Sequence, residues 1–556
     1  MKTKTVFTLI LMVLIIVSCN TNIGEEIMAD LVLLNGKIFT VDKTKPWVEA
    51  VAVKNGKILF TGDSDYVRRL AGSDTEVIDL AGRLAVPGFN DAHVHFSDGG
   101  FYLLGIELRD AKDENEFADR IREYVKTLEK DEWITGGNWD HEIWPSKKHP
   151  VKEMIDEFTK DNPVLVQRLD GHIGLANSLA LKLAGINKNT PNPQGGEIVK
   201  DPKTGEPTGI LKDTGMDPVF NVIPPSSRKR QEESIITAMR HANELGVTSI
   251  QDNTSKTDLE IYQDLYNRGE LTLRINAWRS VGFDDEFEKI GILPPFGSDM
   301  LRIGTIKMFI DGSMGAGTAL FYEPYSDEPA TSGLPIYPEK DLYDLVMKVD
   351  KAGLQIAAHA IGDKANTWIL NAFEKAFSEN GRRDARHRVE HAQVVIPEDI
   401  KRYKELEIIA SIQPSHCIDD MRWAEKRIGD RVKNSYLFNS FVKAGVQVAF
   451  GTDWAVEPLD PMIGLYAAFT REFPEGGPDG GWFPDEKITL EQAIEFYTLG
   501  AAYAEFQEKV KGSISDGKIA DIVVLDKNLF EIPPKEILNT KVDFTILGGK
   551  VVYKGK

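Results

Sequence analysis

Cysteine is almost absent from this sequence, which contains only Cys19 and Cys417 among its 556 residues. If Cys19 is modified, as its position indicates, Cys417 has no partner, and an intrachain disulfide is excluded even in an oxidising compartment. We expect Cys417 to be a small buried side chain near the functional site and not a reactive thiol.

Long hydrophobic runs are also lacking. The apolar run Val6–Val17 has only 12 residues, too few to span a bilayer comfortably, and it follows Lys2 and Lys4. It ends in Ile16-Val17-Ser18-Cys19, which resembles a bacterial lipobox. Residues 1–19 are therefore predicted to be a lipoprotein signal peptide ending at an acylated Cys19, with residues 20–29 as a tether. The alternatives are an ordinary signal peptide and a poor transmembrane anchor. The prediction places the protein on the bacterial cell envelope, held to the membrane by its lipid and facing the periplasm or the exterior.

Positive charge is in short supply. The 66 lysines and arginines are outnumbered by 86 aspartates and glutamates, which gives a net charge of −20 and a pI near 5.1. This balance argues against nucleic acid or an anionic membrane surface as the main partner. The composition, 42% hydrophobic and 27% charged, is that of a globular protein. At this length we expect one large domain with satellites, or two to three domains.

Both ends of the chain read as short strands joined by turns. Asn35-Gly36, Asn55-Gly56 and Gly548-Gly549 separate apolar runs, a pattern that predicts β-hairpins. We therefore expect residues 30–86 and 510–556 to form one small composite, sandwich-like β domain. It would flank a central domain of residues 87–509.

The central region alternates strand-like and helical segments, which predicts an α/β fold with a parallel sheet. A (β/α)8 barrel fits best, because no glycine-rich nucleotide turn follows an early strand, as a doubly wound open sheet would favour. There are nine strand candidates, one more than a barrel needs, so one or two within about 100–230 should belong to an insertion. The candidates are Leu84–Val94, Val164–Leu169, Val247–Gln251, Leu273–Ala277, Arg302–Ile310, Leu354–Ala358, His387–Glu390, Ile408–Gln413 and Val446–Gly451.

The first central strand ends in His93-Val94-His95. Residues i and i+2 of a strand point to the same face, so the two imidazoles form half of a metal site. The alternative is a chance pair of histidines on a half-buried strand.

Metal-ligating residue types recur at the ends of later strands, where a barrel places its active site. Imidazole and carboxylate suit Zn²⁺ and similar divalent ions, which lower the pKa of bound water to about 7. Asp453 is our candidate for moving a proton from that water to the leaving group. Lys307 would serve as a bridging ligand for two ions if CO₂ carboxylated it; the alternative is a structural lysine with an ion-pair partner. The strand-end residues are His93, His95, Lys307, His359, His391 and Asp453.

These positions, taken in order, resemble the amidohydrolase superfamily of metal-dependent hydrolases. The sequence is most similar to the amidohydrolase-3 branch, which contains N-substituted formamide deformylase and the YtcJ-like proteins. The similar segments begin at Pro87, Gly137, Asp170, Val389, Gln413, Gly451 and Gly517, and the resemblance covers residues 30–556. It implies a metal-binding (β/α)8 barrel with a composite β domain.

The resemblance also implies roles for the site residues. His93, His95, His359 and His391 would be ligands, Asp453 a ligand and proton shuttle, and Lys307 a carboxylated bridge between two ions. The expected cofactor is one or two divalent ions, with zinc as the leading candidate.

Residues around the metal should choose the substrate. His172 lies in a segment that faces the active site in family members, so it is expected to bind substrate or to be a structural histidine. Asp311 would bind substrate or cap a turn, His416 would lie at the rim, and Trp139 would form an apolar wall or pack internally. Four other histidines are expected in loops or on the surface: His141, His149, His241 and His387.

The sequence thus predicts an enzyme that hydrolyses a carbon–nitrogen bond of a small N-acyl, N-formyl or cyclic amide with metal-activated water. Ester hydrolysis and deamination remain open alternatives within the same chemistry. A non-catalytic metal- or solute-binding lipoprotein is the alternative from another class, and Asp453 argues against it, because a pure ligand cage needs no proton shuttle.

Overall fold

The computed structural model describes residues 28–168, 173–193, 196–283, 287, 289, 291–292 and 295–556. The predicted leader with Cys19, and the candidate His172, lie outside the described residues. Within the described part of the chain, no helix combines the length and the apolar character needed to cross a membrane.

Eight parallel strands form a nearly closed barrel, in which spatial neighbours follow one another in the chain. An isolated parallel bridge between Val94 and Trp454 joins the first strand to the segment after the last. Two backbone hydrogen bonds support that closure: Asp453 N–H donates to His93 O and His95 N–H to Trp454 O. The α/β barrel prediction is confirmed, and the doubly wound alternative is wrong. The strands are β8 (Phe89–Val94), β15 (Val247–Asn253), β16 (Arg274–Ser280), β18 (Leu301–Phe309), β19 (Gln355–Ala360), β20 (Arg388–His391), β21 (Ile409–Ile412) and β22 (Val448–Phe450).

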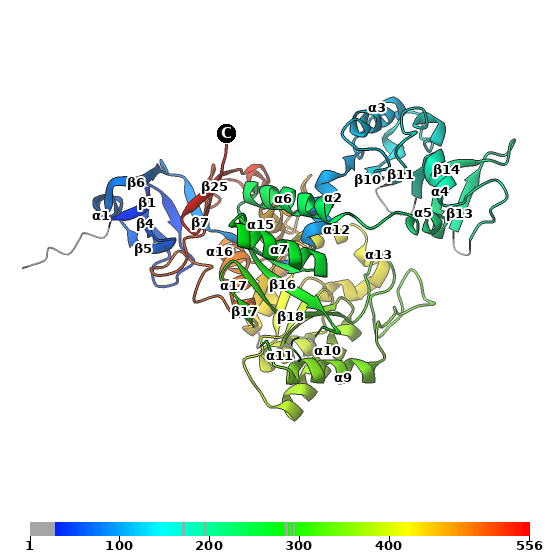
Figure 1. Ribbon diagram of the computed structural model, residues 1–556. Helices are drawn as coiled ribbons and strands as arrows, with labels where there is room; N and C mark the ends of the chain where they lie inside the picture. Colours follow the sequence, from blue (N-terminus) through cyan, green and yellow to red (C-terminus); the bar gives the residue numbers. More distant parts are fainter. Residues whose placement is uncertain are drawn as a thin grey trace, which may run out of the picture.

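Helices cover the outside of the barrel and bury the largest apolar core of the molecule against it (Figure 1). Local sequence marks their ends: at α7, Ser255 and Asp258 form a capping box, and Gly269 ends the helix with φ 71°. The covering helices include α6 (Arg228–Glu244), α7 (Lys256–Arg268), α9 (Glu339–Lys351), α10 (Asp363–Asn380), α11 (Pro397–Glu405), α14 (Phe438–Ala444) and α15 (Pro461–Thr470).

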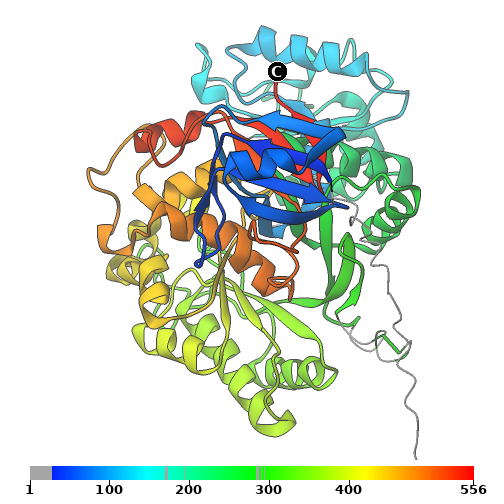
Figure 2. The ribbon, with the colours of Figure 1, turned by 90° about the vertical axis from the view of Figure 1, so that its left-hand side faces the viewer.

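Strands from both ends of the chain share one sheet, seen as adjacent blue and red arrows in Figure 2. Its order is β25 (Lys550–Lys554), β24 (Val542–Leu547), β23 (Ile522–Leu525), β7 (Leu84–Pro87), β2 (Lys37–Phe39) and β3 (Trp47–Val48). A second sheet has the order β5 (Lys57–Gly62), β4 (Ala50–Lys54), β1 (Ala29–Leu34) and β6 (Ala71–Asp79). A separate apolar core includes residues of both sheets, such as Leu33 and Ile522.

Two sequence expectations about strands are corrected. Asn55-Gly56 and Gly548-Gly549 do join antiparallel neighbours, but Asn35-Gly36 connects β1 and β2, which belong to different sheets. The predicted strand Leu84–Val94 is broken at Gly88 into β7 and β8, which also belong to different sheets. A Cβ at Gly88 would lie 2.2 Å from the hydroxyl oxygen of Thr248, so the chain crosses from one sheet to the other where only glycine fits.

The segment of the chain between α2 (Phe96–Leu104) and α6 forms a separate sheet that projects from the barrel (Figure 1). It includes Val164–Arg168, so that strand candidate belongs to the insertion and not to the barrel. The sheet order is β13 (Gly196–Lys200), β14 (Pro207–Asp213), β12 (Ile173–Ala176), β11 (Val164–Arg168), β10 (Ile134–Trp139) and β9 (Ile106–Glu107). With α3 (Glu114–Val125) it buries an apolar core of its own.

Candidate metal centre

The predicted ligands lie at or just beyond the carboxyl ends of barrel strands. His93 is the second-last residue of β8 and His391 is the last residue of β20, while Asp453 follows the end of β22 by three residues. His391 and Asp453 have φ angles of 72° and 60°, a left-handed conformation that L-residues adopt at a cost. Such strain persists only where the surrounding structure enforces it, and it gathers at functional sites.

Asp453 lies between two groups of imidazoles. Its Oδ1 atom is 3.5 Å from Nε2 of His93 and 3.4 Å from Nε2 of His95, and its Oδ2 atom is 3.8 Å from Nε2 of His416. His391 completes the second group, in which one ligand atom of each residue lies within 4.8 Å of the others. Asp453 therefore belongs to both clusters.

The residues fit a divalent ion. Asp453 Oδ1 and His416 Nε2 are buried atoms without a hydrogen-bond partner, and such atoms call for an explanation. Two ligands of a tetrahedral zinc ion, each about 2.0–2.1 Å from it, lie roughly 3.3 Å apart. The spacing of 3.4–3.5 Å between the Asp453 oxygen and the two Nε2 atoms is close to that value.

Burial holds His93, His359 and His391 in their neutral, ligand-ready form. Burial, together with the nearby positive charge of Lys307, lowers the pKa of His93 to about 4 and that of His359 to about 3. For Asp453, burial acts to raise the pKa, but the electrostatic interactions with the neighbouring imidazoles of His93 and His95 outweigh it and hold the pKa well below its usual range.

Lys307 points at the same group of ligands. Its side chain is buried, and its Nζ atom lies 2.9 Å from Nε2 of His93. Burial lowers the pKa of the amine to about 8, which favours the neutral form that reacts with CO₂. Among the described residues, no carboxylate lies within 4 Å of Nζ, although Glu390 and Asp453 are near enough to interact with the amine electrostatically. The carboxylated bridge and the structural lysine both stay predictions.

His359 stands beside the cluster. Its ring centre is 4.4 Å from that of His391, but its Nε2 atom lies 3.2 Å from the carbonyl oxygen of Gly312 and 3.6 Å from Asp311. It is absent from both three-residue groups within the described chain. The Nε2 atom of His359 therefore faces the Gly312 carbonyl in this structure.

Sequence reasoning missed the groups that hold His93. Glu390 is fully buried and its Oε2 atom accepts from Nδ1 of His93 at 2.7 Å, from Ser411 Oγ at 2.7 Å and from Arg388 Nη2 at 3.2 Å. Burial acts to raise the pKa of Glu390, yet Arg388 and His93 lower it to about 2, so the carboxylate stays ionised. This contact leaves Nε2 of His93 as the ligand atom.

Two further positions were missed. Gln413 Oε1 lies 2.8 Å from Nδ1 of His391 and fixes that ring in the same manner. Asn253, the last residue of β15, has its Nδ2 atom 3.1 Å from Nε2 of His93 and 3.5 Å from Nε2 of His95. The strand-end position of Asn253 was the signal available in the sequence.

The residues expected to contact substrate have three different surroundings in the structure. Asp311 accepts backbone N–H bonds from Leu320, Ile361 and Gly362, which matches the turn-capping alternative. His416 joins the ligand cluster. The substrate-binding prediction for Trp139 is wrong, and the internal-packing alternative holds: Trp139 lies in the insertion's apolar core, and its indole N–H donates to the Val166 carbonyl.

Two remaining expectations concern residues that are not predicted ligands. Cys417 is buried, as expected, and burial raises the pKa of its thiol to about 11. His387 is a correction, because it is fully buried, stacks on Phe373 and Phe377 and lies 3.0 Å from Asp350.

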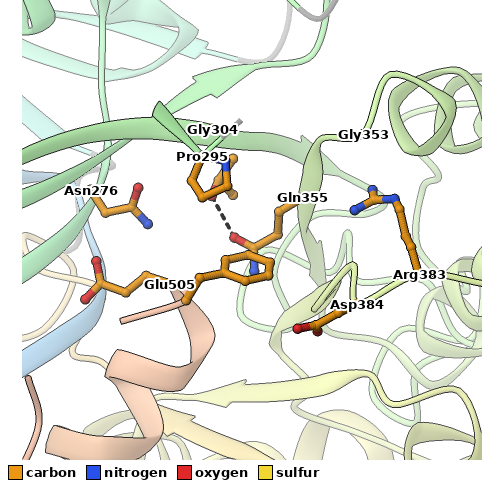
Figure 3. A pocket seen from close by; sticks show the side chains of 10 residues that line it. Asn276, Pro295, Gly304, Gly353, Gln355, Arg383, Asp384 and Glu505 are labelled. Carbon is orange, nitrogen blue, oxygen red and sulfur yellow. Dashed lines mark hydrogen bonds between the residues drawn. The ribbon is translucent and has the colours of Figure 1, made fainter. Parts of the chain in front are cut away.

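A polar cavity of about 70 Å³ lies at the opposite end of the barrel (Figure 3). It is lined by Asn276, Thr305, Gln355 and Glu505, among others, and Thr305 donates to Gln355 at 2.7 Å. Gln355 begins β19, whereas His359 lies near its end, about 13 Å further along at roughly 3.3 Å per residue. The cavity contains no candidate ligand and faces the end of a barrel associated with stability.

Comparison with known proteins agrees with this geometry. Residues 76–553 match the family model described as "Amidohydrolase family". Protein LONG AFTER FAR-RED 3 of Arabidopsis thaliana is 37% identical over 95% of this chain and 92% of its own length. N-substituted formamide deformylase of Arthrobacter pascens is 28% identical over 95% and 99%. A solved structure from Pyrococcus horikoshii OT3, described as an uncharacterized metal-dependent hydrolase, is 29% identical with a TM-score of 0.76, covering 91% of this chain and 99% of that one.

Proposed function

The chain belongs to the amidohydrolase family of metal-dependent hydrolases, and from this premise we propose that it hydrolyses the carbon–nitrogen bond of a small N-acyl, N-formyl or cyclic amide. The observation that carries the proposal is Asp453, whose carboxylate lies between two groups of imidazoles with one oxygen unpartnered. A pure binding protein would need no such group between its ligands. Relatives with different names share this framework, so the substrate class is our inference.

Zinc is the proposed ion, held by His93, His95, His391 and Asp453, with Lys307 and His359 as further ligands. A divalent ion at this position would supply a water of lowered pKa and a positive charge for the carbonyl oxygen. If Lys307 reacts with CO₂, a lysine N–C bond forms, a proton leaves the nitrogen, and the resulting carboxylate provides two ligand oxygens.

The protein's own groups account for the proton. Asp453, ionised and within 3.8 Å of three imidazoles, accepts the proton of the attacking water and passes it to the leaving nitrogen. Glu390 and Gln413 orient His93 and His391 so that their Nε2 atoms face the reaction. Asp311 holds the loop after β18 through its three backbone contacts and keeps the mouth of the barrel in place.

The test combines metal analysis of the purified full-length chain with a panel of N-acyl and N-formyl amines. We expect metal to co-purify and at least one amide to be hydrolysed, with Asp453→Asn lowering kcat by at least about 100-fold, as loss of a general acid–base does. A metal-loaded protein that hydrolyses none of the panel, or an Asp453→Asn variant as active as the wild type, would overturn the proposal.

We also propose that Cys19 carries a lipid that anchors the protein to the cell envelope. The basic start, the 12-residue apolar run and the lipobox-like ending support this. Metabolic labelling with a fatty acid should mark the wild type and not Cys19→Ser, and the variant should leave the membrane fraction. Equal labelling of both proteins would contradict the proposal.

A further inference from the structure

Phe309 is an exposed aromatic side chain beside the predicted ligands. It is the last residue of β18, two positions after Lys307, so both side chains point into the barrel. Lys307 is buried, whereas 40% of Phe309 is exposed. The Phe309 ring centre lies 5.3 Å from that of His359 and 4.8 Å from Nζ of Lys307. Phe309 therefore presents apolar surface at the mouth of the barrel, directly above the ligands.

Other aromatic rings around the cluster are covered by the protein itself. Trp278, whose ring is 5.4 Å from that of His93, is fully buried, and Trp454 is nearly so. Phe309 differs because nothing in the described chain covers its outer surface. A substrate group that covers this ring removes apolar surface from water on both sides of the contact, which favours binding of apolar groups.

An exposed negative charge lies beside His95 at the mouth of the barrel, where it would repel an anionic group of a substrate. Asp98 is an exposed carboxylate whose Oδ2 atom lies 3.9 Å from Nδ1 of His95. In the described part of the chain no lysine or arginine lies within 4 Å of it. An amide derived from an amino acid carries a carboxylate next to its scissile nitrogen, and a like charge placed there disfavours binding.

Resting on the proposed amide hydrolysis, we infer that Phe309 determines specificity: the substrate carries an uncharged apolar group, best an aromatic one, against the Phe309 ring. Asp98 disfavours substrates with a carboxylate beside the scissile nitrogen. The preferred class is therefore N-acyl derivatives of apolar amines, and not N-acyl amino acids.

Three amides separate the two parts of this inference. N-acetyl-2-phenylethylamine and N-acetylphenylalanine differ only by a carboxylate, and N-ethylacetamide lacks the phenyl ring. For the zinc-loaded full-length enzyme at pH 8, we expect kcat/KM to be highest for the first compound. Phe309→Ala should lower that value at least about 10-fold but change the value for N-ethylacetamide less than about 3-fold. Phe309→Leu, which stays apolar, should fall between the two proteins.

The matched control is Phe296→Ala, because Phe296 is also exposed, at 58%, but lies on β17 (Phe296–Gly297), beside Ile303 at the other end of β18. It should leave all three values unchanged. Asp98→Asn should raise kcat/KM for N-acetylphenylalanine relative to N-acetyl-2-phenylethylamine. Equal losses for both neutral amides in Phe309→Ala, or a wild-type preference for N-acetylphenylalanine, would overturn the inference.

A binding measurement decides the inference even if turnover is absent. Calorimetric titration of N-acetyl-2-phenylethylamine and N-acetylphenylalanine into Asp453→Asn protein, with its zinc content measured and matched to that of the wild type, reports affinity without hydrolysis. Tighter binding of the neutral compound, weakened by Phe309→Ala, supports the inference even where failure to hydrolyse any amide refutes the proposed function. Absence of binding, or binding that Phe309→Ala does not weaken, overturns it.

Discussion

Replacing Glu390 by glutamine should weaken zinc binding without touching a ligand. The carboxylate of Glu390 accepts a hydrogen bond from His93 Nδ1 at 2.7 Å and further hydrogen bonds from Arg388 and Ser411. Glutamine offers one acceptor oxygen where the carboxylate offers two. If its NH₂ group turns toward His93, Nδ1 must give up its proton and Nε2 must carry it, so the ligand lone pair is lost.

Substitutions of such supporting groups lower metal affinity by about 10- to 100-fold. That range corresponds to about 1.4–2.7 kcal/mol of binding free energy. Removing the buried negative charge also leaves Arg388 uncompensated, so the folded protein should lose some stability as well. The two effects must therefore be measured separately.

The assay is competition for zinc between a chromophoric chelator and the metal-free protein, with thermal unfolding of the metal-free protein measured in parallel. Ser411→Ala is the matched control, because it removes the Ser411 hydrogen bond to the same Glu390 oxygen, together with the bond that Ser411 accepts from Arg388, and leaves the His93 contact. We expect Ser411→Ala to change zinc affinity less than about 3-fold, because the contact that orients His93 remains and the net value of a hydrogen bond is modest. A folded Glu390→Gln protein that binds zinc within twofold of the wild type would refute the reasoning.

Three further predictions address other parts of the molecule. Native mass measurement should show an adduct of about 44 Da under CO₂, absent from Lys307→Met, which should also bind fewer metal ions; equal metal content in both proteins would argue against a bridging role. Burial holds the pKa of His387 below its ordinary 6.5, partly offset by Asp350. The unfolded chain then binds the proton more readily, so stability falls as the pH drops below about 6.5. Urea unfolding midpoints should fall less between pH 7.5 and 5 in His387→Gln, and parallel curves would contradict this. Gly88→Ala should lower the free energy of unfolding by about 1–3 kcal/mol, because its Cβ would meet Thr248; an unchanged midpoint would show that Thr248 moves aside freely.

The barrel could be predicted because each of its strands carries a local signal. Apolar runs alternate with helical segments, and strands such as β8 and β20 end in metal-ligating residue types. The same pattern therefore predicts both the fold and the candidate site. The exceptions are local. Leu84–Val94 reads as one strand because its apolar pattern is continuous, and only the close approach of Thr248 to Gly88 divides it.

The supporting groups of the site could not be predicted in the same way. Glu390 and Arg388 lie two residues apart in a short strand, a pattern equally compatible with a solvated edge. Their role depends on His93, which is 297 positions from Glu390 in the sequence. Trp139 was misread for a similar reason: an aromatic residue in a loop-like segment cannot be assigned to an internal core until the insertion's sheet is known.

The four imidazoles of the two clusters differ in how firmly they are held, and this difference assigns them different parts. His93 and His391 each have Nδ1 fixed by a buried acceptor, Glu390 and Gln413. Among the described residues, no buried acceptor forms a hydrogen bond with the Nδ1 atom of His95 or of His416. The His95 Nδ1 atom lies 3.9 Å from the exposed carboxylate of Asp98. Ordering a free side chain costs about 0.5–1.5 kcal/mol on binding, and a ring already fixed avoids that cost. The fixed pair should therefore supply most of the metal affinity, whereas the other two rings can adjust as substrate enters and product leaves. Asp453 contacts both kinds, which is the position a proton carrier needs.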